Sequence, residues 1–356
     1  MFSDRGVLDE PTMANFRDLV MQVANTERPS GRKPESEKRW QNRTRKITVH
    51  NEATMMDHIL PLLIKVGRQV PVEGSFTQEE SSMDQAAYHS MWEDFEDSGL
   101  DWTVDQEFSR TYLPNTYSQV GYDAEIAKAL AKERGIKNPK PDRTYGLRVN
   151  DIQPPADRKG GLRDQITAWL NVVPSLQHVF FLIEGKSSAG DMNKAADQAC
   201  RGGTVAVYTQ RQLLEATGQG NIMEEGPDRQ TYVYSATIDD KGMSFWVNFA
   251  LVQKVMPSGE IVVNYHMEHV FSYHFRTVDA ELYLRRVCHN ILDWGVRNRR
   301  PMLELRCLKM YETDGRLIEQ DVARVKELDA EAAEQRQLGG NKRRKIGPGL
   351  VSQRCP

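Results

Sequence analysis

The pattern of apolar and polar positions divides the chain into segments of different character. Residues 179–183 are apolar without polar alternation, which is typical of a strand that is buried on both faces. After residue 226 the period changes toward two. Runs rich in β-branched and aromatic residues occupy 232–238, 244–249 and 261–275, with turn-like residues between them. These three runs predict an antiparallel meander.

Helical periodicity flanks these strands. Residues 123–134 are rich in alanine and end just before Gly135, a residue that favours the left-handed end of a helix. An apolar stripe over 277–294 predicts a second helix. A third is expected over residues 191–200, and the glycine pair at 202–203 predicts that it breaks or bends there.

The outer parts of the chain are more polar and suggest three regions. Residues 1–110 predict an N-terminal arm that is helical in part and otherwise disordered, with a basic linker over 27–46. Residues 111–314 hold the well-patterned domain. Residues 315–356 predict a charged helix followed by a basic tail.

Composition limits the classes of protein that fit. A chain of 356 residues with 39% hydrophobic content can bury a sizeable core. The formal net charge of −3 argues against a uniformly basic surface. The four cysteines are scattered, which favours a reducing compartment over a disulfide framework. We find no secretory leader pattern and no apolar run of the roughly 20 residues that a membrane span needs. We therefore expect an intracellular protein without a membrane partner.

The buried run at 179–183 ends in Glu184, a glycine and Lys186, a charged pair at a place where charge requires a reason. Upstream, Asp142 stands at the head of another strand-like stretch, residues 144–149. Two carboxylates on neighbouring strands offer hard oxygen ligands for Mg²⁺ or Mn²⁺, leaving positions for water and a phosphate oxygen. Such an ion activates water for phosphodiester hydrolysis. Lys186 shares a strand face with Glu184 and can orient that water or stabilise developing charge.

Simpler interpretations of these residues remain open. Asp142 can be a turn residue after a proline, and Glu184 with Lys186 can be a solvated strand end. The 42 positions between the two acidic residues imply an inserted loop. That loop contains other candidates for the first carboxylate: Asp151, Asp157 and Asp164.

The order of these segments resembles the fungal branch of the PD-(D/E)XK nuclease superfamily, over about residues 120 to 300. The stretches that carry the resemblance are Lys140–Asp142, Ile183–Ser187, Asp197–Gly203, Tyr265–Met267 and His289–Gly295. The resemblance implies a restriction-endonuclease-like α/β core. In that core a mixed central sheet is flanked by helices, and here an antiparallel β extension and the N-terminal arm would be added to it.

The resemblance also implies roles for single residues. Lys186 matches the position of the catalytic lysine, and Asp142 and Glu184 match the metal ligands. Glu125 lies on the preceding helix, where many members carry another acidic ligand; a solvent-facing glutamate is the alternative. Gln198, on the following helix, would reach the metal-bound water or a phosphate; the alternative is a buried amide satisfied by backbone.

Other side chains attract weaker hypotheses. If residues 261–275 form a regular strand, His266 and His274 share one face while His269 lies on the other, which disfavours a zinc site. Cys200 is expected in the core rather than as a nucleophile.

Basic clusters have three interpretations. Residues 27–46, residues 342–345, and the arginines 297, 299 and 300 can bind a nucleic-acid backbone. The cluster at 342–345 also fits a nuclear-import signal, and all of them fit solvated segments.

The sequence therefore predicts a Mg²⁺-dependent nuclease with nucleic acid, most simply DNA, as its partner. Two alternatives stay open: a catalytically silent nuclease fold that binds nucleic acid or another partner, and a toxic nuclease of a fungal selfish element or effector. The choice of DNA or RNA, internal or terminal cleavage, and the oligomeric state are not decided by the sequence.

Overall fold

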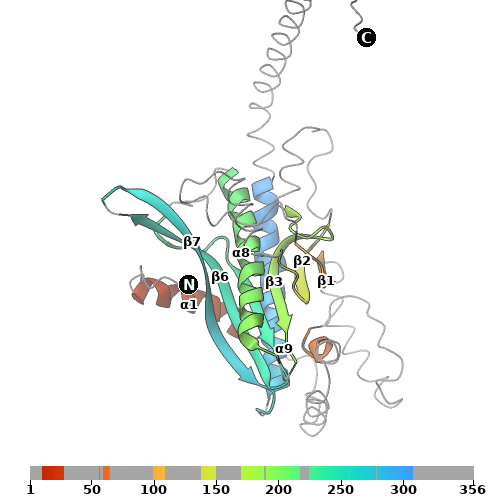
Figure 1. The fold of residues 1–356 in the computed structure, drawn as a ribbon. Helices are drawn as coiled ribbons and strands as arrows, with labels where there is room; N and C mark the ends of the chain where they lie inside the picture. The colour runs from red at the N-terminus through yellow and green to blue at the C-terminus, as the bar shows by residue number, and fades with distance from the viewer. Residues whose placement is uncertain are drawn as a thin grey trace, which may run out of the picture. The chain divides into compact units, whose positions relative to one another are not determined.

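The structure is a computed structural model (Figure 1). It describes residues 10–27, 56, 59–64, 99–108, 138–149, 170–187, 190–216, 224–255, 257–277 and 279–307. All of them belong to one compact unit, residues 1–307. The helices expected over residues 123–134 and in the C-terminal region lie outside the described residues, as does nearly all of the basic linker.

A mixed seven-stranded sheet forms the centre of this unit. Its strands are β1 (Leu100–Val104), β2 (Arg143–Arg148), β3 (Leu176–Gly185), β4 (Gly226–Pro227), β5 (Val233–Ile238), β6 (Gly242–Val255) and β7 (Glu260–His274). The order across the sheet is β1-β2-β3-β5-β6-β4, and β7 pairs with β6. Only the β3–β5 pair is parallel, and the other pairs are antiparallel. The fold class is therefore α/β with a mixed sheet, as the sequence predicts.

Strand β3 occupies the middle of the sheet, and all ten of its residues are buried. This burial confirms the interpretation of the apolar run at 179–183. The predicted meander is also confirmed, because β5, β6 and β7 pair antiparallel in sequence order. Strand β6, with 14 residues, extends well beyond the run at 244–249, whereas β7 matches the run at 261–275 with a shift of one residue.

Helices cover both faces of the sheet (Figure 1). They are α1 (Glu10–Asn25), the short α4 (Leu60–Leu63), α8 (Met192–Ala216), α9 (Ala280–Asp293) and the π-helical η3 (Trp294–Arg299). Helix α8 lies on one face. Helices α1 and α9 with η3 lie on the other.

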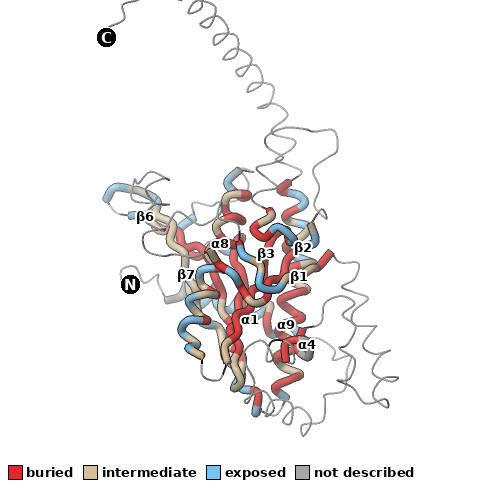
Figure 2. Tube along the Cα trace, turned by 45° about the vertical axis from the view of Figure 1, so that its right-hand side comes forward, coloured by how far each residue is buried: buried red, intermediate tan, exposed pale blue. Residues whose placement is uncertain are grey.

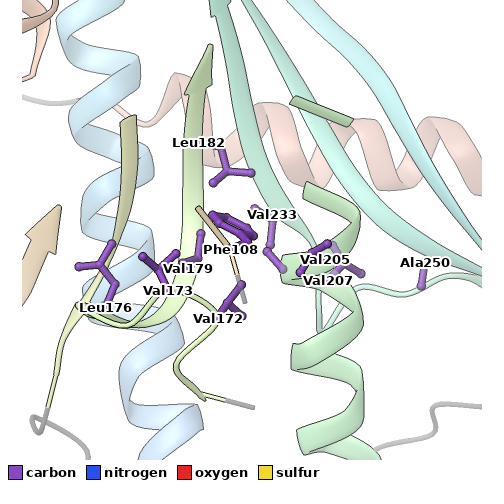
Figure 3. Close-up of a cluster of buried hydrophobic side chains, with 11 residues drawn as sticks. Phe108, Val172, Val173, Leu176, Val179, Leu182, Val205, Val207, Val233 and Ala250 are labelled. Atoms are coloured by element: carbon purple, nitrogen blue, oxygen red, sulfur yellow. The ribbon is translucent and has the colours of Figure 1, made fainter. Parts of the chain in front are cut away.

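The hydrophobic core has a part on each face of the sheet (Figure 2). Beneath α8, aliphatic side chains of the helix and strands pack around Phe108 (Figure 3). On the opposite face the core is aromatic. Phe16 of α1 contacts Phe249 at a centroid distance of 4.8 Å, and Trp294 stacks on Tyr232 at 4.8 Å. Fully burying one such ring contributes roughly 1.5–3 kcal/mol.

Helix α1 is joined to this core by hydrogen bonds as well as by packing. The Tyr234 hydroxyl donates to the carbonyl of Val20 at 3.0 Å. The side-chain amide of Asn290, on α9, donates to the carbonyls of Ala24 at 2.9 Å and Thr26 at 2.8 Å. Helix α1 therefore packs with α9 against the sheet. The predicted arm, residues 1–110, also contains β1, which pairs with β2, so the expectation that this region is only helical or disordered is wrong for residues 100–104.

Of the two outcomes expected at the glycine pair, a break or a bend, the break is wrong, because α8 runs continuously through it. A Cβ atom at Gly203 would lie 2.1 Å from Cγ of Asn248, and one at Gly202 would lie 3.1 Å from Cδ1 of Leu182. The glycines therefore permit close packing of helix on sheet. The sequence pattern alone does not distinguish a glycine that ends a helix from one that lets it pack closely.

We expect Gly203→Ala to lower the free energy of unfolding by up to about 2 kcal/mol. Overpacking costs ~1–3 kcal/mol, and the better helix propensity of alanine offsets roughly 1 kcal/mol of that. The matched control is Gly202→Ala, whose Cβ would lie 3.1 Å from Leu182, 3.4 Å from Pro141 and 3.9 Å from Pro139. These contacts are looser, so this variant should be close to neutral. Urea denaturation of both variants measures the difference. Equal stability of the two would contradict the packing argument.

Candidate metal centre

The carboxylate of Asp142 lies beside the end of the central strand. In the antiparallel pairing of β2 and β3, Arg143 is opposite Ile183, so the next position brings Asp142 opposite Glu184. Residues opposite each other in such a pair project to the same face of the sheet. Oδ2 of Asp142 accepts a hydrogen bond from the backbone N–H of Gly185 at 2.5 Å. Asp142 is thereby fixed against the last residues of β3.

Glu184 and Lys186 follow on the same face of that strand. Glu184 is completely buried and pairs with Thr237 on β5. The backbone N–H of Lys186 donates to the carbonyl of Ile238 at 2.9 Å, which extends the β3–β5 pairing past the strand end. The Lys186 Nζ atom donates to the carbonyl of Gly185 at 2.6 Å. A buried carboxylate and a half-buried ammonium group therefore lie close to Asp142.

Gln198 approaches these groups from α8. Gly202 packs on Leu182 and Pro141, which fixes where the helix crosses the strand. One helical turn back from Gly202 is ~5.4 Å, and two residues onward along β3 is roughly 6.6 Å. Because α8 returns antiparallel to β3, we infer from these steps that Gln198 lies above the part of β3 that contains Glu184. Within the described part of the chain, the Oε1 atom of Gln198 is buried without a hydrogen-bond partner.

The donor set fits a hard divalent cation. Asp142 and Glu184 offer carboxylate oxygens and Gln198 offers an amide oxygen, which are the ligands that Mg²⁺ and Mn²⁺ prefer. Burying a carboxylate is costly unless a countercharge or a metal compensates for it. Among the described residues no group of three or more His, Cys, Asp or Glu side chains forms a metal cluster. Any ion here would therefore complete its coordination shell with water and substrate oxygens, or with ligands outside the described ranges.

The remaining candidate ligands fall outside the described residues: Glu125, Asp151, Asp157 and Asp164. Asp142 is the candidate for the first carboxylate that the described residues bring next to Glu184.

Comparison with protein families gives one match. Residues 39–305 match the family described as a domain of unknown function, DUF7924. The chain belongs to this family. No curated protein and no solved structure matches the chain. Within the described part of the DUF7924 chain, no helix is long and apolar enough to cross a membrane.

The histidines of the DUF7924 domain are arranged differently from the expectation. His269 pairs with Trp246 and His274 with Gly242, because the β6–β7 register shifts between Phe245 and Trp246 and passes over Val270 of β7. His274 therefore shares a face with His269, whereas His266, opposite Phe249, lies on the other face. The prediction that His266 and His274 share a face is wrong. The three histidines are still divided between two faces.

The arginines after α9 serve the core and the helix surface. Arg299 is buried, donates to the carbonyls of Gln230 and Tyr232, and lies over the rings of Tyr232 and Trp294 at 4.6 and 4.5 Å. Burial lowers the pKa of Arg299 to about 10, so it stays charged at neutral pH. Arg300 pairs with Glu304. The hypothesis that Arg299 lines a nucleic-acid groove is therefore wrong.

Cys200 is half-buried, and burial raises the pKa of its thiol. The expected core position is therefore reached only in part, while a raised thiol pKa lowers the thiolate fraction at neutral pH and disfavours a nucleophile.

Sequence reasoning did not identify two residues that lie near the candidate metal centre. Thr237 lies opposite Glu184, and the indole N–H of Trp246 donates to its hydroxyl at 3.1 Å. The period-two pattern marks both residues as strand positions. Their nearness to Glu184 depends on the parallel β3–β5 pairing, which connects segments separated by α8.

Proposed function

We propose that this DUF7924 domain is a metal-dependent nuclease that hydrolyses phosphodiester bonds in nucleic acid, with DNA as the expected substrate. The observation that carries the proposal is the hydrogen bond from Gly185 to Asp142, 2.5 Å long. It holds the carboxylate of Asp142, which immediately precedes β2, next to Glu184 of β3 and Lys186, which immediately follows β3. These three residues lie in two of the five stretches that carry the resemblance to PD-(D/E)XK nucleases.

Each residue has a distinct role in the proposed reaction. Asp142 and Glu184 would hold Mg²⁺ or Mn²⁺, which when bound lowers the pKa of water and polarises the phosphate. Lys186 orients the attacking water and stabilises the negative charge that develops on the phosphate. Gln198 would direct its amide toward the same water or a phosphate oxygen. Complete burial of Glu184 keeps this end of the site dry, which strengthens each electrostatic interaction.

The test is cleavage of supercoiled plasmid and of circular single-stranded DNA in Mg²⁺, Mn²⁺ or EDTA. We expect metal-dependent cleavage that Lys186→Ala reduces by about 10²-fold, the usual effect of removing one preorganised charge-stabilising group. Lys254→Ala is the matched control, because Lys254 is an exposed lysine near the far end of β6. Wild-type protein that binds DNA but stays inert with both metals would favour the silent binding module instead.

A further inference from the structure

A row of hydroxyl side chains runs across the sheet from the candidate metal centre. Thr237 is opposite Glu184, Ser244 is opposite Thr237, and Ser272 is opposite Ser244. The two serine oxygens are 2.7 Å apart. With ~4.8 Å between strands, this row extends about 14 Å from Glu184. Its members change from buried Thr237 through half-buried Ser244 to exposed Ser272, so the row opens to solvent.

An aromatic pair borders this row. The rings of Trp246 and His269 are 4.9 Å apart at an interplanar angle of 71°. The Trp246 indole is held by its hydrogen bond to Thr237, and Nε2 of exposed His269 lies 2.7 Å from the Ser272 hydroxyl. Both rings are thus fixed by members of the row. Trp246 is two strands across and two residues along from Glu184, roughly 12 Å away.

Cationic residues stand at the same end of the sheet. Lys241 is exposed in the turn between β5 and β6, and its carbonyl accepts from the N–H of Phe275, one residue before exposed Arg276. The same turn contains two acidic residues. The first, Asp239, accepts hydrogen bonds from the N–H groups of Lys241 and Gly242. Asp240 is the other acidic residue there, and it is half-buried. With Lys186, this end of the sheet offers three lysine or arginine side chains to an anionic chain.

We propose that the Trp246–His269 pair binds an unstacked base, so that a single-stranded segment of nucleic acid is the substrate of the metal centre. The inference rests on the proposed nuclease function. The occupant follows from the neighbouring groups: ring faces for a base, hydroxyls and cations for phosphates, and carboxylates for a metal at one end. Bases inside a duplex are stacked on each other and do not reach such a pair, whereas a single strand offers its bases freely.

Binding in EDTA tests this independently of cleavage. Fluorescence anisotropy of a labelled oligothymidylate should show single-strand binding that is tighter than binding to a blunt duplex of equal length. Trp246→Leu should weaken single-strand binding about tenfold, since stacking on an aromatic ring contributes ~1–3 kcal/mol per base. Trp246→Phe keeps a ring and should retain most of the affinity.

His266→Ala is the matched control for the aromatic pair, because His266 lies on β7 as His269 does but on the opposite face of that strand. If Trp246→Leu does not fold, His269→Ala at an exposed position carries the test. Unchanged affinity in folded Trp246→Leu or in His269→Ala, or tighter binding of the duplex, overturns the inference. Metal-dependent cleavage with no effect of Trp246→Leu would refute the base-binding pair alone. Single-strand binding that needs Trp246, without cleavage in any metal, would refute the nuclease alone.

Discussion

Glu184→Gln is expected to reduce cleavage by about 10³-fold while the protein remains folded. The amide preserves the volume of a completely buried side chain but removes one of the two carboxylates beside Lys186. A catalytic cation supplies several kcal/mol of transition-state stabilisation, and ~1.4 kcal/mol corresponds to a factor of ten in rate. Loss of the ion therefore costs more than loss of the lysine.

A second measurement separates loss of metal from loss of chemistry. Saturating Mn²⁺ should raise the midpoint of thermal unfolding of the wild type, because a ligand that binds only the folded state stabilises it. Lys186→Ala should keep that rise, and Glu184→Gln should lose most of it. A normal Mn²⁺ shift in Glu184→Gln, together with normal cleavage, would remove Glu184 from the site. Circular dichroism controls for folding in both variants.

The second large effect concerns stability. Asp228→Ala is expected to lower the free energy of unfolding by about 3–5 kcal/mol, because it breaks a buried ion pair. Nη1 of Arg211 donates to Oδ2 of Asp228 at 2.6 Å, and the side chains are only 2% and 6% exposed. The same carboxylate accepts from the Thr231 hydroxyl at 2.7 Å and the Gln230 N–H at 2.8 Å.

Arg297→Ala provides the contrast. The ion pair of Arg297 with Asp293 has an N–O distance of 3.8 Å, and the Arg297 side chain is 66% exposed. Surface pairs of this kind contribute roughly 0–1 kcal/mol. Urea unfolding of the two variants should therefore separate them by more than 2 kcal/mol, as estimated from these ranges. Similar small losses in both would show that the Arg211 site relaxes or hydrates when its carboxylate is removed.

The central strand and the meander could be predicted because each leaves a direct mark on the sequence. A strand buried on both faces requires consecutive apolar residues, and residues 179–183 supply them. The meander requires alternation with turns between the runs, which residues 232–275 show. Helix α9 follows from its apolar stripe, and the structure begins it at Ala280, three residues after the expected start.

What the sequence could not predict depends on contacts between distant segments. The bulge that moves His274 to the face of His269 arises from the pairing of β6 with β7. The packing role of Gly203 within the unbroken α8 depends on the close approach of Asn248, which lies far along the chain. Arginine is most often a surface residue. Arg299 is buried in the core only because two backbone carbonyls accept its hydrogen bonds and two aromatic rings stack beneath its guanidinium group.

The residues of the candidate site also fall into those whose positions could be predicted from the sequence and those whose positions could not. Glu184 and Lys186 are local to one strand, so their shared face follows from alternation alone. The position of Asp142 needs the register of β2 on β3, which the 42-residue separation does not determine. The position of Gln198 depends on where α8 crosses β3, which the sequence does not determine. Glu125 stays a prediction, as does nuclear import through residues 342–345, because both lie outside the described residues.

The contacts of Arg299 also define the shortest fragment that can be produced in folded form. A fragment spanning residues 138–277 contains Asp142, Glu184, Lys186 and Gln198 but ends before η3. It would uncover the rings of Tyr232 and Tyr234 and leave two carbonyls without their donors. The side-chain amide of Asn290 in turn donates to two carbonyls at the end of α1, so a fragment without α1 would leave this amide without its acceptors. Expression of this protein for crystallisation should therefore retain α1 at one end and η3 at the other.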